Sequence, residues 1–138
     1  MTKLRVLIVD DNEMNIVIAE AALIADGVEV DSASNAQEAL ARIASFRPDL
    51  ILMDIQMPGV DGLELTRQLK ADPAAQHTII VAFTAFAMRG DEEKMRAAGC
   101  DGYLSKPIDV KKFAAQVRAC LGDPRGDGCG KLAASPAA

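Results

Sequence analysis

The sequence predicts a single α/β domain in which an open parallel sheet is covered by helices on both faces. Five short runs of apolar and β-branched residues alternate with five stretches of helical composition, and turn residues separate them. The chain has 138 residues, which is enough for one domain with a moderate core but not for two. These observations indicate a (βα)5 arrangement.

The strands are expected where apolar or β-branched runs are short, and the helices where capping signatures precede longer apolar periodicity. Ser34 with Gln37 and Asp61 with Glu64 have the spacing of capping boxes, and Gly27 ends the first helix. The expected elements, in chain order, are strand 4–9, helix 13–25, strand 28–33, helix 34–44, strand 50–53, helix 61–71, strand 78–84, helix 91–98, strand 102–104 and helix 109–121.

Right-handed crossovers and coverage of both faces allow few strand orders, and 2-1-3-4-5 is the flavodoxin-like one. Ligands of such sheets bind beyond the carboxyl ends of the strands, at the switch point between the first and third strands. Asp10 and Asp11 follow the first strand, and Asp54 ends the third. The predicted order therefore places these three carboxylates side by side.

Three carboxylates about 4–5 Å apart repel one another by roughly 3–4 kcal/mol per pair at an effective dielectric constant near 20. Such a cluster holds a proton or binds a cation, and its hard oxygen ligands suit Mg²⁺. The alternative is that the three residues are separate turn and cap residues, which aspartate also favours. A carboxylate at the end of a buried strand, as at Asp54, favours the metal site.

Two further polar residues follow later strands, Thr84 after the fourth and Lys106 after the fifth. A hydroxyl and an ammonium group that converge on a metal and an aspartate form a phosphoryl-transfer site, with nucleophile, metal and cationic clamp. Lys106 precedes Pro107 at a strand end, which favours this interpretation over an ordinary surface lysine.

The composition excludes several other functions. The net charge of −5 argues against nonspecific binding of nucleic acid. No apolar run approaches the roughly 18 residues of a membrane span, and the first strand begins too early for a signal peptide. Three cysteines without metal-ligand spacing indicate reduced thiols in a cytoplasmic protein. Residues 122–138 lack periodicity and are expected to be a disordered tail after a domain of residues 1–121.

Taken together, the motifs resemble the receiver domain of two-component response regulators, over residues 4 to about 121. The motifs are Asp10-Asp11, Asp54 before Met-Pro-Gly, Thr84-Ala85, and Tyr103 three residues before Lys106-Pro107. A more detailed likeness, over Thr84 to Glu93, Gly99-Cys100 and Ser105 to Ile108, is to stand-alone receivers that regulate the bacterial cell cycle.

The resemblance implies that Asp54 accepts a phosphoryl group from a histidine kinase or a histidine phosphotransfer protein. It further implies that Asp11 binds Mg²⁺ directly, that Asp10 helps through water, and that the main-chain carbonyl of Gln56 completes the site. Lys106 would hold the phosphoryl group. The chain would catalyse only its own phosphorylation and dephosphorylation, and would not be an enzyme acting on other substrates.

The resemblance also implies a switch in which Thr84 moves toward the phosphoryl group and Tyr103 rotates inward. A contact made only in the phosphorylated state is what a two-state shift requires. A protein effector would then bind the last helices and strand.

Helix 13–25 carries only two charges. If Met14 and Ile18 face the sheet, Ile16 and Leu23 remain uncovered, so part of this helix is expected to dock on the helical bundle of a kinase. The candidate partner-binding residues are Met14, Ile16, Val17 and Pro107.

Three alternatives remain open. A receiver belonging to a hybrid histidine kinase would relay phosphate onward. A flavodoxin-like electron carrier shares the topology, but Asp10-Asp11 would repel a flavin phosphate. A metal-dependent phosphatase needs its nucleophile after the first strand and another aspartate two residues later, a spacing that Asp10-Asp11-Asn12 lacks.

Overall fold

The computed structural model describes residues 4–54, 56–57, 60–73, 78–84, 89–105, 111–120 and 130–131. The elements within these ranges are β1 (Arg5–Val9), α1 (Glu13–Ala25), β2 (Glu29–Ala33), α2 (Ala36–Phe46), β3 (Leu50–Asp54), β4 (Gln56–Met57), β5 (Val60–Asp61), α3 (Gly62–Ala71), β6 (Ile79–Thr84), α4 (Arg89–Ala98), β7 (Gly102–Ser105), α5 (Phe113–Cys120) and β8 (Gly130–Lys131).

The main sheet has the order β2-β1-β3-β6-β7, and all of these neighbours are parallel. This confirms the predicted order 2-1-3-4-5. Two features were not expected from the sequence: β4 and β5 form a small antiparallel hairpin, and β8 adds a sixth, antiparallel strand beside β7. Gly130–Lys131 belong to the predicted tail and form this short strand. The rest of residues 122–138 lies outside the described residues.

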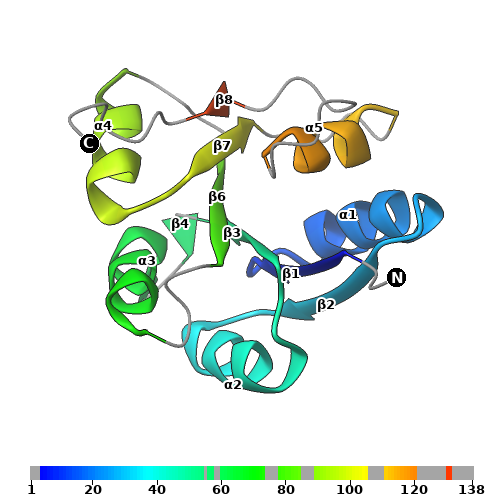
Figure 1. Cartoon of the computed structure of the whole chain (residues 1–138), viewed down its shortest axis with the longest axis horizontal. Coiled ribbons are helices and arrows are strands. Elements are labelled where there is room, and N and C mark those ends of the chain that lie inside the picture. Colours follow the sequence, from blue (N-terminus) through cyan, green and yellow to red (C-terminus); the bar gives the residue numbers. More distant parts are fainter. Residues whose placement is uncertain are drawn as a thin grey trace.

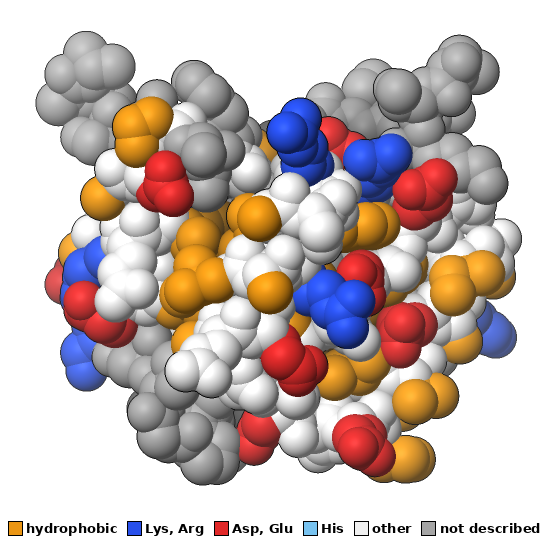
Figure 2. Space-filling model, turned by 90° about the horizontal axis from the view of Figure 1, so that it is seen from below, with side chains coloured by type: hydrophobic (Ala, Val, Ile, Leu, Met, Phe, Trp, Pro, Cys, Tyr) orange, Lys and Arg blue, Asp and Glu red, His pale blue; other side chains and the backbone are white. Residues whose placement is uncertain are grey.

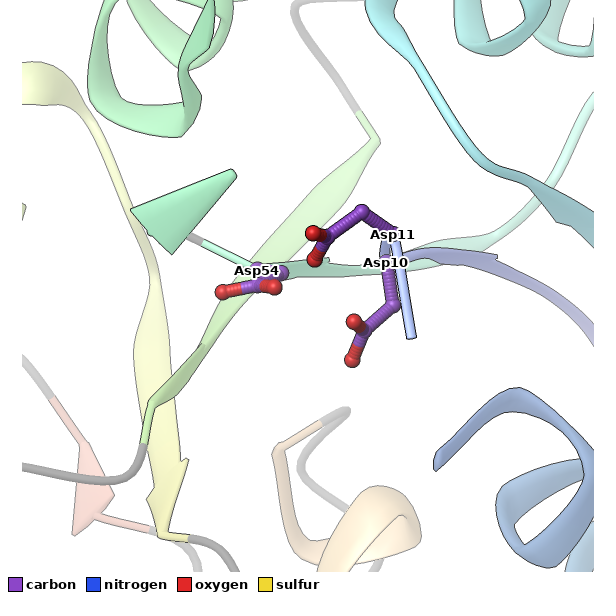
Figure 3. A group of neighbouring side chains, drawn as sticks. All are labelled: Asp10, Asp11 and Asp54. Carbon is purple, nitrogen blue, oxygen red and sulfur yellow. The ribbon is translucent and has the colours of Figure 1, made fainter. Parts of the chain in front are cut away.

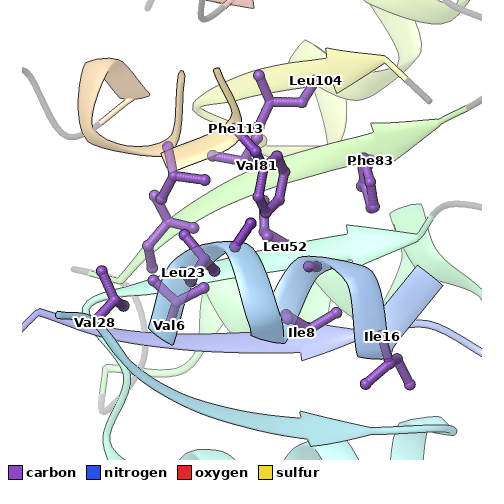
Figure 4. Close-up of a cluster of buried hydrophobic side chains, with 14 residues drawn as sticks. Val6, Ile8, Ile16, Leu23, Val28, Leu52, Val81, Phe83, Leu104 and Phe113 are labelled. Carbon is purple, nitrogen blue, oxygen red and sulfur yellow. The ribbon is translucent and has the colours of Figure 1, made fainter. Parts of the chain in front are cut away.

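The sheet separates two hydrophobic cores (Figure 1). One core lies against α1 and α5, and the other against α2, α3 and α4. Successive side chains of β1 alternate between them, since Val6 and Ile8 point to the first core and Leu7 and Val9 to the second. Figure 4 shows the first core, in which Phe113 of α5 packs above the strands. A sheet buried on both faces explains why its central strands are continuously apolar.

The buried face of α1 is not the predicted one. Met14 is 67% exposed, whereas Ile16 is only 8% exposed and Leu23 is fully buried. Ile16, Ala19 and Leu23 are spaced three and four residues apart, so they form one stripe against the sheet. The small side chain of Ala19 lets the helix approach the strands closely. The prediction that Ile16 and Leu23 remain uncovered is therefore wrong, and Ile16 is removed from the candidate partner-binding residues.

Two asparagines cap the first two helices. Asn12 accepts hydrogen bonds from the backbone N–H groups of Met14 and Asn15 at the start of α1. At the start of α2, Asn35 accepts from the backbone of Glu38, so the capping residue is one position later than the capping box predicted from Ser34. Asparagine at these positions satisfies backbone donors that the first turn leaves unpaired.

Figure 2 views the molecule from the side of α2 and shows acidic, basic and small hydrophobic patches interspersed on this face. A surface of mixed charge offers no extended basic area for a nucleic-acid backbone. Among the described residues, no helix is long and apolar enough to cross a membrane.

Candidate phosphoacceptor and metal site

The pairing of β1 with β3 creates the site. The two strands are parallel and in register, with Val9 opposite Met53, so the next residue of each strand, Asp10 and Asp54, lies at the same edge of the sheet. Asp11 follows in the turn that leads to α1. The prediction that these carboxylates meet is confirmed, because one oxygen from each of the three lies within 4.8 Å of the others.

Two of the three carboxylates are buried. Asp10 is fully buried and Asp54 is 3% exposed, whereas Asp11 is exposed. Figure 3 shows the carboxylate of Asp11 turned toward Asp54 from the neighbouring strand end. The cluster thus has a buried floor, formed by Asp10 and Asp54, and a side at Asp11 that opens to solvent.

Local hydrogen bonds hold Asp10 in place. Its backbone N–H donates to the carbonyl of Ala33 at 3.0 Å, which ties the end of β1 to the end of β2. Its Oδ1 accepts from the backbone N–H of Asn12 at 2.9 Å. Asn12, which caps α1, therefore also orients the carboxylate of Asp10. The sequence signal for this role is an aspartate two residues before a helix-capping asparagine.

The donor chemistry of the cluster fits Mg²⁺. Carboxylate oxygens are hard ligands, and Mg²⁺ in proteins takes one or two carboxylates while keeping several waters. A divalent cation also offsets the repulsion among three carboxylates within 4.8 Å of one another. The cluster would hold such an ion through Asp11 and Asp54, with Asp10 behind them.

The structure describes the other predicted site residues only in part. Thr84 ends β6 and lies in register with Ser105 of β7. Tyr103 lies in β7 and packs, half-buried, against the core under α2, α3 and α4. Gln56 belongs to β4 and pairs with Asp61. Lys106 and Pro107 lie outside the described residues.

A cavity of about 550 Å³ lies elsewhere, between α2 and the end of α3. Its walls include Leu40, Ile43 and Leu69, with Arg47 and Asp72 also lining it. None of the three carboxylates of the cluster lines it.

A sequence profile of the family described as "Response regulator receiver domain" matches residues 6–118. The chain belongs to the response regulator receiver family. The match begins in β1 and ends in α5, so the receiver comprises the whole parallel sheet and the carboxylate cluster.

Curated relatives and solved structures agree with this assignment. The receiver is 48% identical to the polar-differentiation response regulator DivK of Brucella anthropi, over 86% of this chain and 96% of that protein. It is 47% identical to DivK of Brucella suis, over 89% of this chain and 99% of that protein. The detailed likeness to stand-alone receivers, expected from the sequence, is thus to DivK.

Among solved structures, the chemotaxis response regulator CheY4 of Vibrio cholerae matches with a TM-score of 0.81 and 28% identity, over 87% of this chain and all of that chain. The receiver domain of a sensor histidine kinase from Pseudomonas aeruginosa matches with a TM-score of 0.77 and 31% identity, over 88% of this chain and all of that chain. That structure has a magnesium ion coordinated in its active site cleft.

Proposed function

We propose that this receiver accepts a phosphoryl group on Asp54 in a Mg²⁺-dependent reaction, from a histidine kinase or a histidine phosphotransfer protein. The observation that carries the proposal is the carboxylate cluster at the joined ends of β1 and β3, in which Asp54 is buried beside Asp10 and faces Asp11. The receiver would comprise residues 1–121 and act in the cytoplasm.

The chemistry follows from the cluster. A carboxylate oxygen of Asp54 attacks the phosphorus of a phosphohistidine; a P–O bond forms, the P–N bond breaks, and its electron pair returns to the imidazole nitrogen. Bound Mg²⁺ would supply positive charge at the phosphoryl oxygens. Asp11 and Asp54 would hold that ion, with Asp10 helping through water and the main-chain carbonyl of Gln56 as a further ligand. Lys106 would hold the phosphoryl group.

The signal would be read by another protein. Phosphorylation adds close to two negative charges and strong acceptor oxygens. Thr84, at the end of β6, would donate a hydrogen bond to this group, and Tyr103 of the neighbouring strand would rotate inward. The changed surface of the last helices and β7 would then bind a protein effector. The receiver would catalyse only its own phosphorylation and dephosphorylation.

The exposed apolar side of α1 supports docking of the phosphodonor protein. Met14, Val17 and Ile24 are 67%, 59% and 58% exposed, on the side of the helix away from the sheet. Apolar side chains exposed on one helix suit helix-against-helix docking. Met14 and Val17 lie in the turns next to Asp11, so a donor helix seated there would bring its histidine toward the cluster. Pro107, beyond β7, would complete this surface.

The experiment is incubation with acetyl phosphate and Mg²⁺, followed by intact mass. Wild type is expected to gain one phosphoryl group, and Asp54→Asn to gain none. Asp72→Asn, at the end of α3, is the control and is expected to behave as wild type. Phosphorylation of Asp54→Asn to the wild-type level, or labelling of wild type without Mg²⁺, would refute the proposal.

A second candidate function is that of a phosphorelay intermediate, as in a hybrid histidine kinase. The observation that favours it is the 31% identity to a receiver domain of a sensor histidine kinase, over all of that chain. Back-transfer distinguishes the two functions. A relay intermediate passes its phosphoryl group on to a histidine phosphotransfer protein, whereas a receiver at the end of a pathway keeps it until hydrolysis.

A further inference from the structure

The outer edge of the sheet carries a strand that the parallel fold does not require. Gly130–Lys131 pair antiparallel with Gly102–Tyr103, with Gly102 opposite Lys131 and Tyr103 opposite Gly130. Figure 1 shows β8 beside β7, beyond the last parallel strand. Gly130–Lys131 thus lie beside the strand that contains the proposed switch residue Tyr103.

The two edges of the parallel sheet differ in how they resist pairing. An edge strand presents unpaired N–H and C=O groups, and charged side chains protect it from added strands. At one edge, β2 carries Glu29 and Asp31. At the other, β7 reads Gly-Tyr-Leu-Ser and carries no charge. The edge of β7 is therefore the one suited to accept an extended segment.

Gly130, the residue opposite Tyr103, is also suited to a strand that can detach from the sheet. Directly opposed residues of an antiparallel pair lie on the same face of the sheet, so the aromatic ring and Gly130 share a face. An aromatic side chain can cover the backbone of a glycine opposite it. Tyr103 is half-buried against the core, so a change in its rotamer alters the surface that Gly130 meets.

The added strand is short and separable from the fold. It contributes two residues, whereas typical strands have five or six, so local opening of this pair costs little. The curated relatives are matched over 96–99% of their own length by 118–123 residues of this chain. β8 also lies outside residues 6–118, the part of the chain that matches the receiver family, so the fold of the family does not require it.

We propose that the outer edge of β7 is a strand-docking surface, and that Gly130–Lys131 occupies it as a removable strand that shields the Tyr103 face. A partner that uses this face must displace the segment, by presenting an extended strand of its own or by binding the neighbouring helices. This inference rests on the proposed function and extends it, since Gly130–Lys131 would compete with the protein effector for the same edge of β7.

The test is amide hydrogen exchange, read by mass spectrometry on a peptide that spans residues 102–105, in full-length unphosphorylated protein. Proline cannot donate a ladder hydrogen bond, and one of two adjacent residues in an antiparallel pair donates to the partner strand. At least one of Gly130→Pro and Lys131→Pro is therefore expected to speed exchange of the one amide in this peptide that donates to β8 about tenfold or more, while the amides that donate to β6 are unchanged. Ala134→Pro is the matched control. Peptides from β1 and β3 should be unchanged in all three variants.

A synthetic peptide of residues 127–135, added to the faster-exchanging variant, should restore protection of residues 102–105. Equal exchange in wild type and both proline variants would overturn the proposal, as would failure of the peptide to restore protection. Protection that rises with protein concentration, together with a dimer in light scattering, would also overturn it, because a second copy would then supply the strand. None of these measurements uses phosphorylation, so a negative result leaves the proposed role of Asp54 intact. A failure of Asp54 to accept a phosphoryl group would likewise leave the pairing of β8 with β7 intact.

Discussion

Replacement of Asp54 by asparagine tests the electrostatics of the carboxylate cluster directly. Asp10 and Asp54 are both buried, and their nearest ligand oxygens lie within 4.8 Å. Coulomb's law gives a repulsion of about 3.5 kcal/mol at that separation and an effective dielectric constant of about 20. Asparagine has nearly the same shape and no charge. We expect Asp54→Asn to raise the free energy of unfolding of the metal-free protein by about 1–3 kcal/mol, since solvent near Asp11 screens part of the repulsion.

The assay is urea unfolding at neutral pH, with EDTA and then with Mg²⁺, for wild type and Asp54→Asn. Mg²⁺ at about ten times its Kd stabilises a protein that binds it only when folded by about 1.4 kcal/mol, so wild type should gain stability on addition of the ion. Asp54→Asn should gain much less, because it has lost one ligand and the charge that attracts the cation.

Glu93→Gln removes the same charge from an exposed position of α4 and serves as the control. It should change the free energy of unfolding by no more than about 0.5 kcal/mol, with or without Mg²⁺. A metal-free Asp54→Asn protein less stable than wild type would refute the repulsion, and an equal response of both proteins to Mg²⁺ would refute the ligand assignment.

Three other predictions concern the remaining polar and exposed groups. Lys70 donates at 2.8 Å both to Asp101 and to the carbonyl of Thr78, so Lys70→Met should lower the free energy of unfolding by about 2 kcal/mol, as measured by thermal unfolding. Arg67→Met breaks an exposed pair with Glu64 and should lower it by at most about 0.5 kcal/mol. Equal losses in the two variants would refute this difference. Burial raises the pKa of the Cys100 thiol to about 11, so the folded protein keeps this proton at a pH where the unfolded chain loses it. The free energy of unfolding should therefore fall by up to about 2–3 kcal/mol between pH 9 and pH 11. Cys100→Ala should remove this contribution to the pH dependence of stability. Val17→Glu, on the exposed side of α1, should slow phosphotransfer from the cognate histidine protein tenfold or more while acetyl phosphate still labels Asp54. Leu40→Glu, at an apolar position of α2 that is 45% exposed, should leave this phosphotransfer unchanged. Equal loss with both phosphodonors in Val17→Glu would exclude a docking role.

The parallel sheet and the carboxylate cluster could be predicted because each depends on local patterns. Short β-branched runs that alternate with helices leave few topologies, and the strand order then brings Asp10 to Asp54 whatever the details of packing. The observed register of β1 with β3, in which Val9 lies opposite Met53, agrees with this prediction.

The sequence-based predictions failed where side-chain packing, rather than a local sequence pattern, determines the structure. Nearly all positions of α1 are apolar, so its periodicity did not identify which side meets the sheet, and the choice depended on the small Ala19 and on contact with α5. The short strand Gly130–Lys131 was not anticipated, because the tail lacks strand propensity and the pairing depends on a neighbouring edge far away in sequence. Asn35 was missed as a cap because Ser34, one residue earlier, satisfied the same spacing rule.

The division of the interior by the sheet has a consequence for how this protein can change over evolutionary time. The core under α1 and α5 and the core under α2, α3 and α4 share the strand backbones but few side-chain contacts, so substitutions in one should add independently to substitutions in the other. The helix proposed to meet the phosphodonor can therefore acquire a new partner without repacking the layer under α4. Recognition of the phosphodonor by α1 can change separately from the layer under α4 while the carboxylates between the two layers stay in register.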